Sequence, residues 1–156
     1  MTVRLDPGLH YSDARLAALH HWWQAKAAVR GALPGRADFE PLEMRDLLQD
    51  LYMVDVLRLP DALRFRYRLI GTAITQRTGR DVTGRFFEDV YPAWLLADFS
   101  ASFRWIVAER RPLRSFGNME FSGQGYLGFE ALEVPLATDG NQIDIILGVL
   151  ALLPAP

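Results

Sequence analysis

The segment from residue 64 to residue 92 constrains the fold of this chain more than any other part of the sequence. Residues 64–69 alternate arginine with phenylalanine, tyrosine and leucine, which is the period of a half-buried β-strand. Residues 72–87 are too interrupted by Gly79 and Gly84 for one long helix and too apolar for a simple loop. The segment therefore predicts a strand followed by short helical turns that pack against a sheet.

The rest of the chain adds helices and strands around this segment. Residues 1–11 carry no periodic signal and are expected to form a loose arm. The last apolar segment has the composition of a strand buried at the centre of a sheet. The order of elements predicts an α+β fold with helices on one face of an antiparallel sheet. The predicted elements are helices over 13–30, 40–49 and about 92–110, and strands over 51–59, 64–70, 113–121, 126–136 and 143–153.

Several short motifs follow one another along the chain. The central run contains Gly71-Thr72 and Gly79-Arg-Asp-Val-Thr-Gly84-Arg85, and Val134-Pro135-Leu136 precedes Asp139-Gly140 near the end. In this order, after a Trp22-Trp23 pair and a Leu33-Pro-Gly-Arg-Ala-Asp38 connector, they resemble a PAS (Per-Arnt-Sim) sensor domain, and more narrowly the stand-alone bacterial PAS-like group. The resemblance implies a five-stranded antiparallel sheet, a pocket between sheet and helices, and sensing or protein interaction rather than catalysis. The predicted helix over 13–30 is additional to that core.

Composition removes several classes of function. The net charge of -2 gives no global reason to expect a nucleic-acid-binding protein. The absence of cysteine excludes disulfides, thiolate catalysis and photochemistry through a cysteinyl-flavin adduct. The polar start of the chain predicts no signal peptide, and the longest apolar stretch, residues 145–153, is about half a membrane span. A cytoplasmic protein without an integral membrane segment is therefore expected.

The three histidines give no support for a metal or haem site. His10, His20 and His21 all precede the predicted PAS-like core, and neighbouring residues on a helix do not face one point. No histidine follows residue 52, so haem ligation does not carry over from the resemblance. The identity of any cofactor stays open.

The pocket implied by the resemblance needs apolar walls and a few polar groups. Thr72 and Thr75 are the candidates for polar contacts. The aromatic candidates could equally form an ordinary packed core, and the sequence leaves a ligand pocket and a packed core both open. The candidate lining residues are Tyr67, Leu69, Thr72, Thr75, Phe86, Phe87, Phe99, Phe103, Phe129 and Leu147.

Arginines concentrate in the central segment. Their guanidinium groups suit carboxylate or phosphate groups, so this surface is a candidate for an anionic metabolite, a nucleotide messenger or an acidic partner. Solvated faces and salt bridges are the alternative, and Asp55 on the neighbouring strand is a cross-strand partner for one arginine. The six arginines are Arg64, Arg66, Arg68, Arg77, Arg80 and Arg85.

The helix predicted over 13–30 carries two apolar stripes. One stripe can dock on the domain, and the other, formed by Ala18, Trp22, Ala25 and Val29, then needs a partner subunit or a wider contact within the chain. The first alternative predicts a homodimer. Accordingly, residues 1–38 are interpreted as arm, helix and connector, and residues 39–156 as the PAS-like domain.

The leading hypothesis is a PAS-like sensory or protein-interaction module that binds a small ligand or an unidentified signalling partner. The alternative is a small α+β enzyme that acts on a hydrophobic substrate and requires a buried carboxylate with a raised pKa. Membrane-surface binding through Trp22 and Trp23 is a third hypothesis, although that helix has no strongly cationic face. The available carboxylates are Asp81, Glu88, Asp89, Glu130 and Glu133, of which the last two are expected to pair with strand arginines.

Overall fold

The computed structural model describes residues 2–120 and 126–153, which form one antiparallel sheet with helices on both faces. The strands are β1 (Thr2–Asp6), β2 (Leu51–Arg58), β3 (Leu63–Ile70), β4 (Leu113–Glu120), β5 (Tyr126–Leu136) and β6 (Ile145–Leu152). The α-helices are α1 (Ala14–Arg30), α2 (Thr72–Thr78), α3 (Phe87–Val90) and α4 (Ala93–Glu109), and the 3-10 helices are η1 (Arg36–Asp38) and η2 (Arg45–Asp50). The predicted α+β class is confirmed.

The six strands lie in the order β1-β4-β5-β6-β2-β3. β6 lies between β5 and β2, so the apolar last strand is inside the sheet as predicted. The first strand was not expected. The loose arm predicted over 1–11 is wrong for β1, which pairs with β4 from Thr2↔Asn118 to Asp6↔Arg114. β1 is short and is held by a segment far away in the sequence, so its residues show no periodic pattern that would predict a strand.

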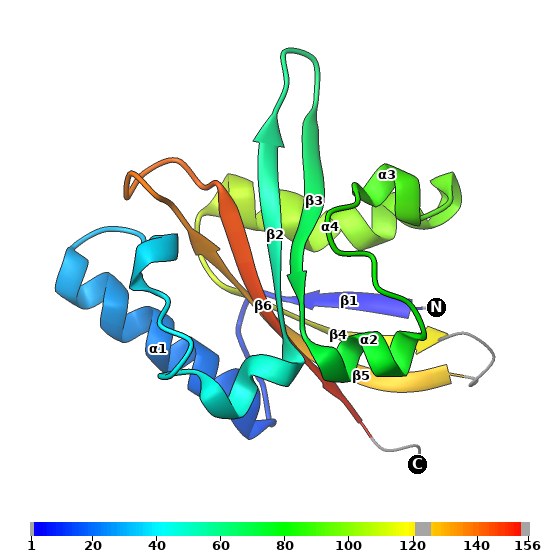
Figure 1. Cartoon of the computed structure of the whole chain (residues 1–156), viewed down its shortest axis with the longest axis horizontal. Helices are drawn as coiled ribbons and strands as arrows, with labels where there is room; N and C mark the ends of the chain where they lie inside the picture. The colour runs from blue at the N-terminus through cyan, green and yellow to red at the C-terminus, as the bar shows by residue number, and fades with distance from the viewer. Residues whose placement is uncertain (1, 121–125, 154–156) are drawn as a thin grey trace.

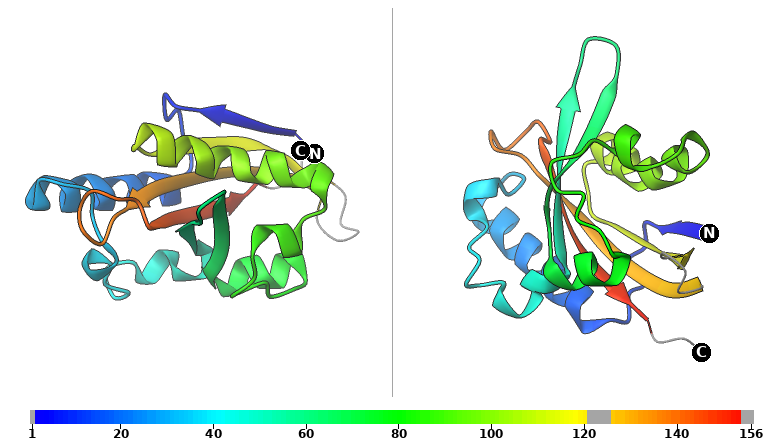
Figure 2. Two further views of the ribbon diagram at one scale, coloured as in Figure 1. Left: turned by 90° about the horizontal axis from the view of Figure 1, so that it is seen from above. Right: turned by 45° about the vertical axis from the view of Figure 1, so that its right-hand side comes forward.

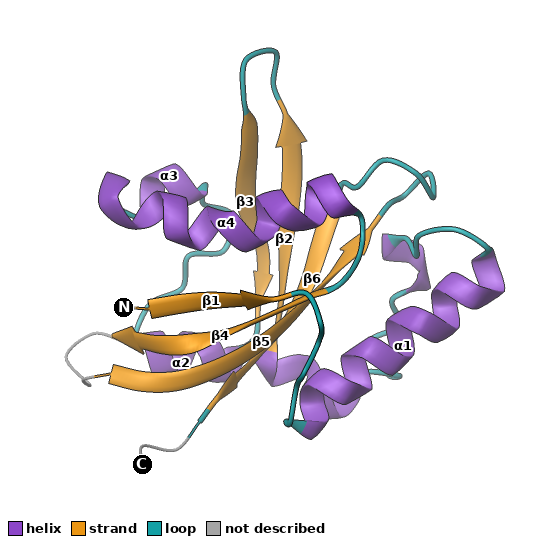
Figure 3. Ribbon diagram, turned by 180° about the vertical axis from the view of Figure 1, so that it is seen from behind, coloured by secondary structure: helices purple, strands orange, loops and turns teal. Residues whose placement is uncertain are grey.

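Two clusters of buried side chains lie on the two faces of the sheet. On one face, Leu16 and Leu19 of α1 pack on the inner residues of β5 and β6 (Figures 1 and 2). On the other face, Phe103 and Ile106 of α4 pack on β2 and β3 (Figure 3). α1 thus lies opposite α3 and α4. The strands of the sheet lie between the two clusters.

The helix boundaries follow local chemistry. Asp13 caps α1 because its side chain accepts a hydrogen bond from the backbone N–H of Arg15 at 2.8 Å. Gly31 ends the helix in the left-handed conformation. The preceding residue, Ser12, donates from its backbone N–H to the Glu130 carboxylate at 2.9 Å. The short helix predicted over 40–49 is a 3-10 helix, η2.

The central segment folds as predicted into a strand and short turns. Gly79 and Gly84 both have positive φ, which explains their presence at turns. The backbone N–H of Gly84 donates to the carbonyl of Tyr67 at 2.6 Å, so residues 84–86 cover the outer edge of β3.

Within the described ranges, no helix combines the length and the apolar character needed to cross a membrane.

Candidate functional site

The inner face of the sheet beneath α4 carries a carboxyl group beside a tyrosine. Tyr52 of β2 and Glu133 of β5 both have Gly148 of β6 as their register partner, so their side chains flank this glycine on one face. A Cβ atom at position 148 would lie only 2.2 Å from the Tyr52 ring. Glycine therefore allows the ring to lie across β6 toward Glu133.

Glu133 is buried without an opposite charge. Its residue exposure is 2%, and one carboxylate oxygen, Oε2, has no hydrogen-bond partner among the described residues. Burial raises the pKa of the carboxyl group to about 7, although hydrogen bonds from Ser102 of α4 and from Tyr52 act in the opposite direction. A buried carboxyl group with a free oxygen can exchange a proton near neutral pH or accept a hydrogen bond from a ligand.

Two further tyrosines extend this polar region. The hydroxyls of Tyr67 on β3 and Tyr91 before α4 are hydrogen-bonded to each other. Desolvation raises the pKa of Tyr67 well above its usual value, and the neighbouring Tyr91 adds to this effect. Both groups therefore remain neutral hydroxyls that can donate or accept hydrogen bonds. We refer to Tyr52, Tyr67, Tyr91, Ser102 and Glu133 as the interior cluster.

Of the predicted pocket residues, Tyr67 belongs to the interior cluster, and Phe87, Phe99 and Phe103 pack around it. The ring of Tyr67 lies 4.7 Å from that of Phe87, which contacts Phe103 at 5.1 Å. Phe99 stacks on Tyr91 with a centroid distance of 3.9 Å and an interplanar angle of 7°. The aromatic rings pack on one another, and the polar groups of the interior cluster lie among them. This arrangement is a packed aromatic core with hydrogen-bonding groups inside it.

The remaining predicted pocket residues lie away from the interior cluster or at its margin. A register shift between Met53 and Val54 turns Leu69 to the face opposite Tyr67 and leaves it 42% exposed. Leu147 belongs to the cluster under α1, because alternate residues of β6 face opposite sides. Phe86 lies outside, beneath Arg64.

The last three predicted pocket residues are two threonines on α2 and one phenylalanine on β5. Thr72 is exposed, and the hydroxyl of Thr75 donates to the backbone carbonyl of Gly71 at 3.4 Å. Phe129 is buried on β5. Among the described residues, no hydrogen bond joins Thr72 or Thr75 to the interior cluster.

The predicted arginine surface divides into separate groups. Arg66 and Arg68 both pair with Asp55, at 3.0 and 3.3 Å, so the cross-strand partner expected from the sequence is confirmed. Arg64 lies 3.5 Å from Glu88 and over the ring of Phe86. Arg80 and Arg85 donate to the backbone carbonyls of residues 90 and 89, and Arg77 lies on α2. Only Arg66 and Arg68 share a surface hollow.

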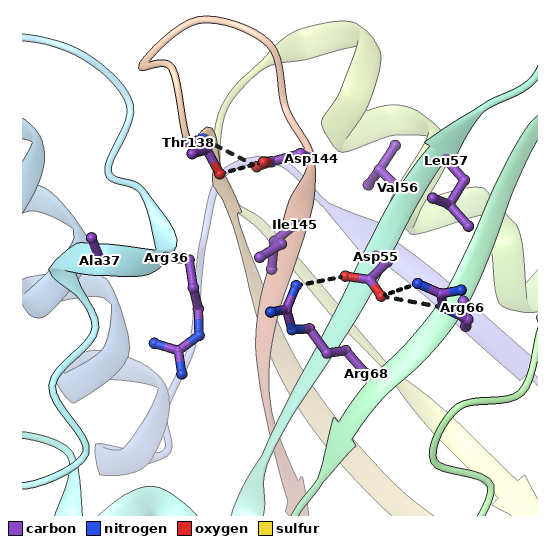
Figure 4. A pocket seen from close by; sticks show the side chains of 10 residues that line it. All are labelled: Arg36, Ala37, Asp55, Val56, Leu57, Arg66, Arg68, Thr138, Asp144 and Ile145. Atoms are coloured by element: carbon purple, nitrogen blue, oxygen red, sulfur yellow. Dashed lines mark hydrogen bonds and ion pairs between the residues drawn. The ribbon is translucent and has the colours of Figure 1, made fainter.

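This hollow, which we call the arginine groove, lies between the β2–β3 hairpin, η1 and the start of β6 (Figure 4). Its volume is about 600 Å³. Arg36, which the sequence analysis did not select, points into it from η1. The lining residues are Arg36, Ala37, Asp55, Val56, Leu57, Arg66, Arg68, Thr138, Asp144 and Ile145.

The candidate dimer stripe is only partly free. Trp22 is 8% exposed and packs edge-on against Phe39 at 6.1 Å, so this side chain is part of the core. Ala18, Ala25 and Val29 are exposed, Val29 by 90%. The helix therefore presents small apolar side chains, and not a tryptophan, to any partner subunit.

Sequence reasoning assigned the wrong environment to Glu133. Glu130 does pair with a strand arginine, Arg114, at 3.0 Å, as expected. Glu133 has no such ion pair among the described residues. The available signal was its position in an apolar strand, with Leu132 and Val134 on either side. A carboxylate that points inward from such a strand needs either a charged partner or a proton.

A family model described as PAS domain matches residues 11–151. A solved structure of an RNA-binding light-oxygen-voltage receptor aligns with 76% of this chain at 15% identity and a TM-score of 0.49. The alignment covers 35% of the receptor chain, so the present chain spans about a third of its length. No curated protein matches the sequence.

Proposed function

Because the chain belongs to the PAS domain family, we propose that it is a sensory or protein-interaction module whose sensing centre is the interior cluster beneath α4. The observation that carries this proposal is the buried Glu133 carboxyl group, one oxygen of which lacks a hydrogen-bond partner among the described residues. Unsatisfied polar groups are rare in packed interiors, and a ligand or a proton satisfies them.

The signal passes through the sheet. Ser102 connects Glu133 to α4, and the neighbours of Glu133 along β5, Leu132 and Val134, pack in the cluster under α1. A ligand that donates a hydrogen bond to Glu133 and displaces an aromatic ring would alter the packing of α4 and shift β5 relative to α1. Such a ligand can shift the protein from one packing arrangement of α4 and β5 to the other only if its affinity for the two arrangements differs.

The output of the module is contact with another protein. In this proposal the exposed stripe of α1 joins two copies of the chain, and an unidentified signalling partner reads the change in α1. The ligand is a small molecule with an apolar body and a hydrogen-bond donor, since aromatic rings and a carboxyl group surround it.

Native mass spectrometry of freshly purified protein, followed by denaturing spectra of the same sample, tests the ligand. We expect a species with extra mass that disappears on denaturation, and less of this species in Glu133→Gln. A bare chain in both spectra would contradict the ligand and leave a module that acts by protein contact alone.

A second candidate function is the small enzyme with a buried carboxylate. The raised pKa of Glu133 is the property that this hypothesis requires. Glu133 lines neither the arginine groove nor the second surface hollow, beside α2, so a substrate, like the proposed ligand, has to displace packed aromatic rings to reach it. Incubation of the protein with a metabolite extract distinguishes the enzyme from the sensory module. An enzyme consumes a compound catalytically, and Glu133→Gln should abolish this consumption.

A further inference from the structure

The arginine groove lies on the face of the sheet opposite the interior cluster. Asp55 forms ion pairs with two arginines of the groove, Arg66 and Arg68. Asp55 is also the register partner of Ile145, which packs in the cluster under α1. α1 covers β5 and β6 but leaves the β2–β3 hairpin open on this face (Figure 1). The groove is therefore a separate surface, independent of the proposed sensing centre.

Positive charge exceeds negative charge in this groove. Asp55 is 8% exposed and is shared between two guanidinium groups, whose side chains remain 39% exposed for Arg66 and 50% exposed for Arg68. Two arginines on one carboxylate leave one positive charge without a counter-charge. The Asp55–Arg68 contact, at 3.3 Å, is also the longer of the two pairs.

Arg36 brings a third guanidinium group toward the same space. It donates one hydrogen bond of 3.3 Å to the carbonyl of Phe39 and lies over the Phe39 ring at 5.3 Å. It forms no ion pair within the described ranges. Both Arg36 and Arg68 line the groove, Arg36 from the side of η1 and Arg68 from the side of the β2–β3 hairpin (Figure 4).

The other carboxylate in the groove is already engaged. Asp144 accepts hydrogen bonds from the backbone N–H and the hydroxyl of Thr138, and so closes the turn between β5 and β6. The three arginines therefore face two carboxylates, one of which serves a turn. An incoming anion meets donors that lack a full complement of acceptors.

We propose that the arginine groove binds a small organic anion, with a phosphate or carboxylate group held between Arg36 and Arg68. Planar guanidinium groups match the oxygen pairs of such groups. The volume of about 600 Å³ suits a molecule of metabolite size. Ala37, Leu57 and Ile145 provide apolar contacts for the carbon skeleton.

Calorimetric titration with pyrophosphate and with citrate, at constant ionic strength, tests this site. We expect one of the two to bind with one-to-one stoichiometry, and the better probe distinguishes a phosphate from a carboxylate ligand. Arg36→Gln and Arg68→Gln should each weaken that binding by about tenfold or more. Arg77→Gln, an exposed arginine on α2 outside the groove, is the matched control and should leave the affinity unchanged.

Asp55→Asn supplies a second measurement. Removal of the competing carboxylate frees Arg66 and Arg68, so binding of the same probe should become tighter, provided that thermal unfolding shows the variant to be folded. Absence of one-to-one binding for both probes would overturn the proposal, as would equal losses in Arg77→Gln and Arg68→Gln. Neither result bears on the interior cluster, which the mass-spectrometric experiment tests separately.

Discussion

At the scale of single residues, Glu133 shows how a packed environment sets the charge of a side chain. Its carboxyl group receives hydrogen bonds from Ser102 and Tyr52, yet burial outweighs them and raises its pKa to about 7. Glu130, three residues earlier, is equally buried but pairs with Arg114 at 3.0 Å. The two carboxylates of one strand differ because alternate positions face opposite sides of the sheet.

The pKa of Glu133 predicts that stability falls as pH rises. Its carboxyl group titrates near 4.5 when unfolded and at about 7 in the fold, so below pH 4.5 both states are protonated and no penalty arises. Between these values the unfolded chain gains stability by losing its proton, and above about pH 7 the fold carries the full cost, about 3 kcal/mol.

Urea unfolding followed by tryptophan fluorescence, between about pH 5 and pH 8, measures this effect. Glu133→Gln should lose most of the pH dependence and exceed the original chain in stability at the upper end. Glu130→Gln is the control, because loss of the Arg114 ion pair should lower stability while the slope persists. An identical slope in Glu133→Gln and the original chain would show that this carboxyl group is not responsible.

At the scale of elements, α1 has a buried side and an exposed side. Leu16, Leu19 and Trp22 are buried against β5, β6 and Phe39, so this side of the helix belongs to the core. Ala18, Ala25 and Val29 remain exposed on the other side. A variant that tests dimerisation must therefore change the exposed side and leave the core intact.

Val29→Arg should convert the proposed dimer into a monomer, because two guanidinium groups would meet at the proposed contact between the two α1 helices. Analytical ultracentrifugation at several protein concentrations measures the change. Trp94→Arg, at a 76% exposed position on α4, is the matched control and should leave the dimer unchanged. A dimer of equal affinity in both variants would place the interface away from this stripe of α1.

At the scale of the whole molecule, the first 38 residues are joined to the sheet on two sides. β1 pairs with β4 along its full length, and Asp6 pairs with Arg114 at 3.0 Å. α1 buries its inner side chains against the two middle strands, β5 and β6. The proposed division into residues 1–38 and 39–156 has to be tested against these contacts.

Deletion of residues 1–32 is the direct test of this division. We expect loss of cooperative thermal unfolding, because the deletion exposes the apolar faces of β5 and β6, and burial of a single large side chain contributes about 2–3 kcal/mol. Circular dichroism during heating gives the measurement. A cooperative transition in the truncated chain would instead show that residues 33–156 fold without the first helix.

The sequence by itself determined the elements whose signals are local. The helix over 13–30, the alternating strand over 64–70, the turns at Gly79 and Gly84 and the apolar last strand all follow from periodicity and backbone preference. The motif order also indicated the PAS family, which the match over residues 11–151 confirms.

Only the tertiary structure decided which side chains meet, because these contacts join segments far apart in the sequence. β1 has no periodic signal and is a strand only through β4. The register shift after Met53 turns Leu69 away from Tyr67, and Gly148 lets Tyr52 reach Glu133. Strand register and the packing of helices on two faces thus set the interior cluster and the arginine groove, and neither is encoded in any one stretch of the chain.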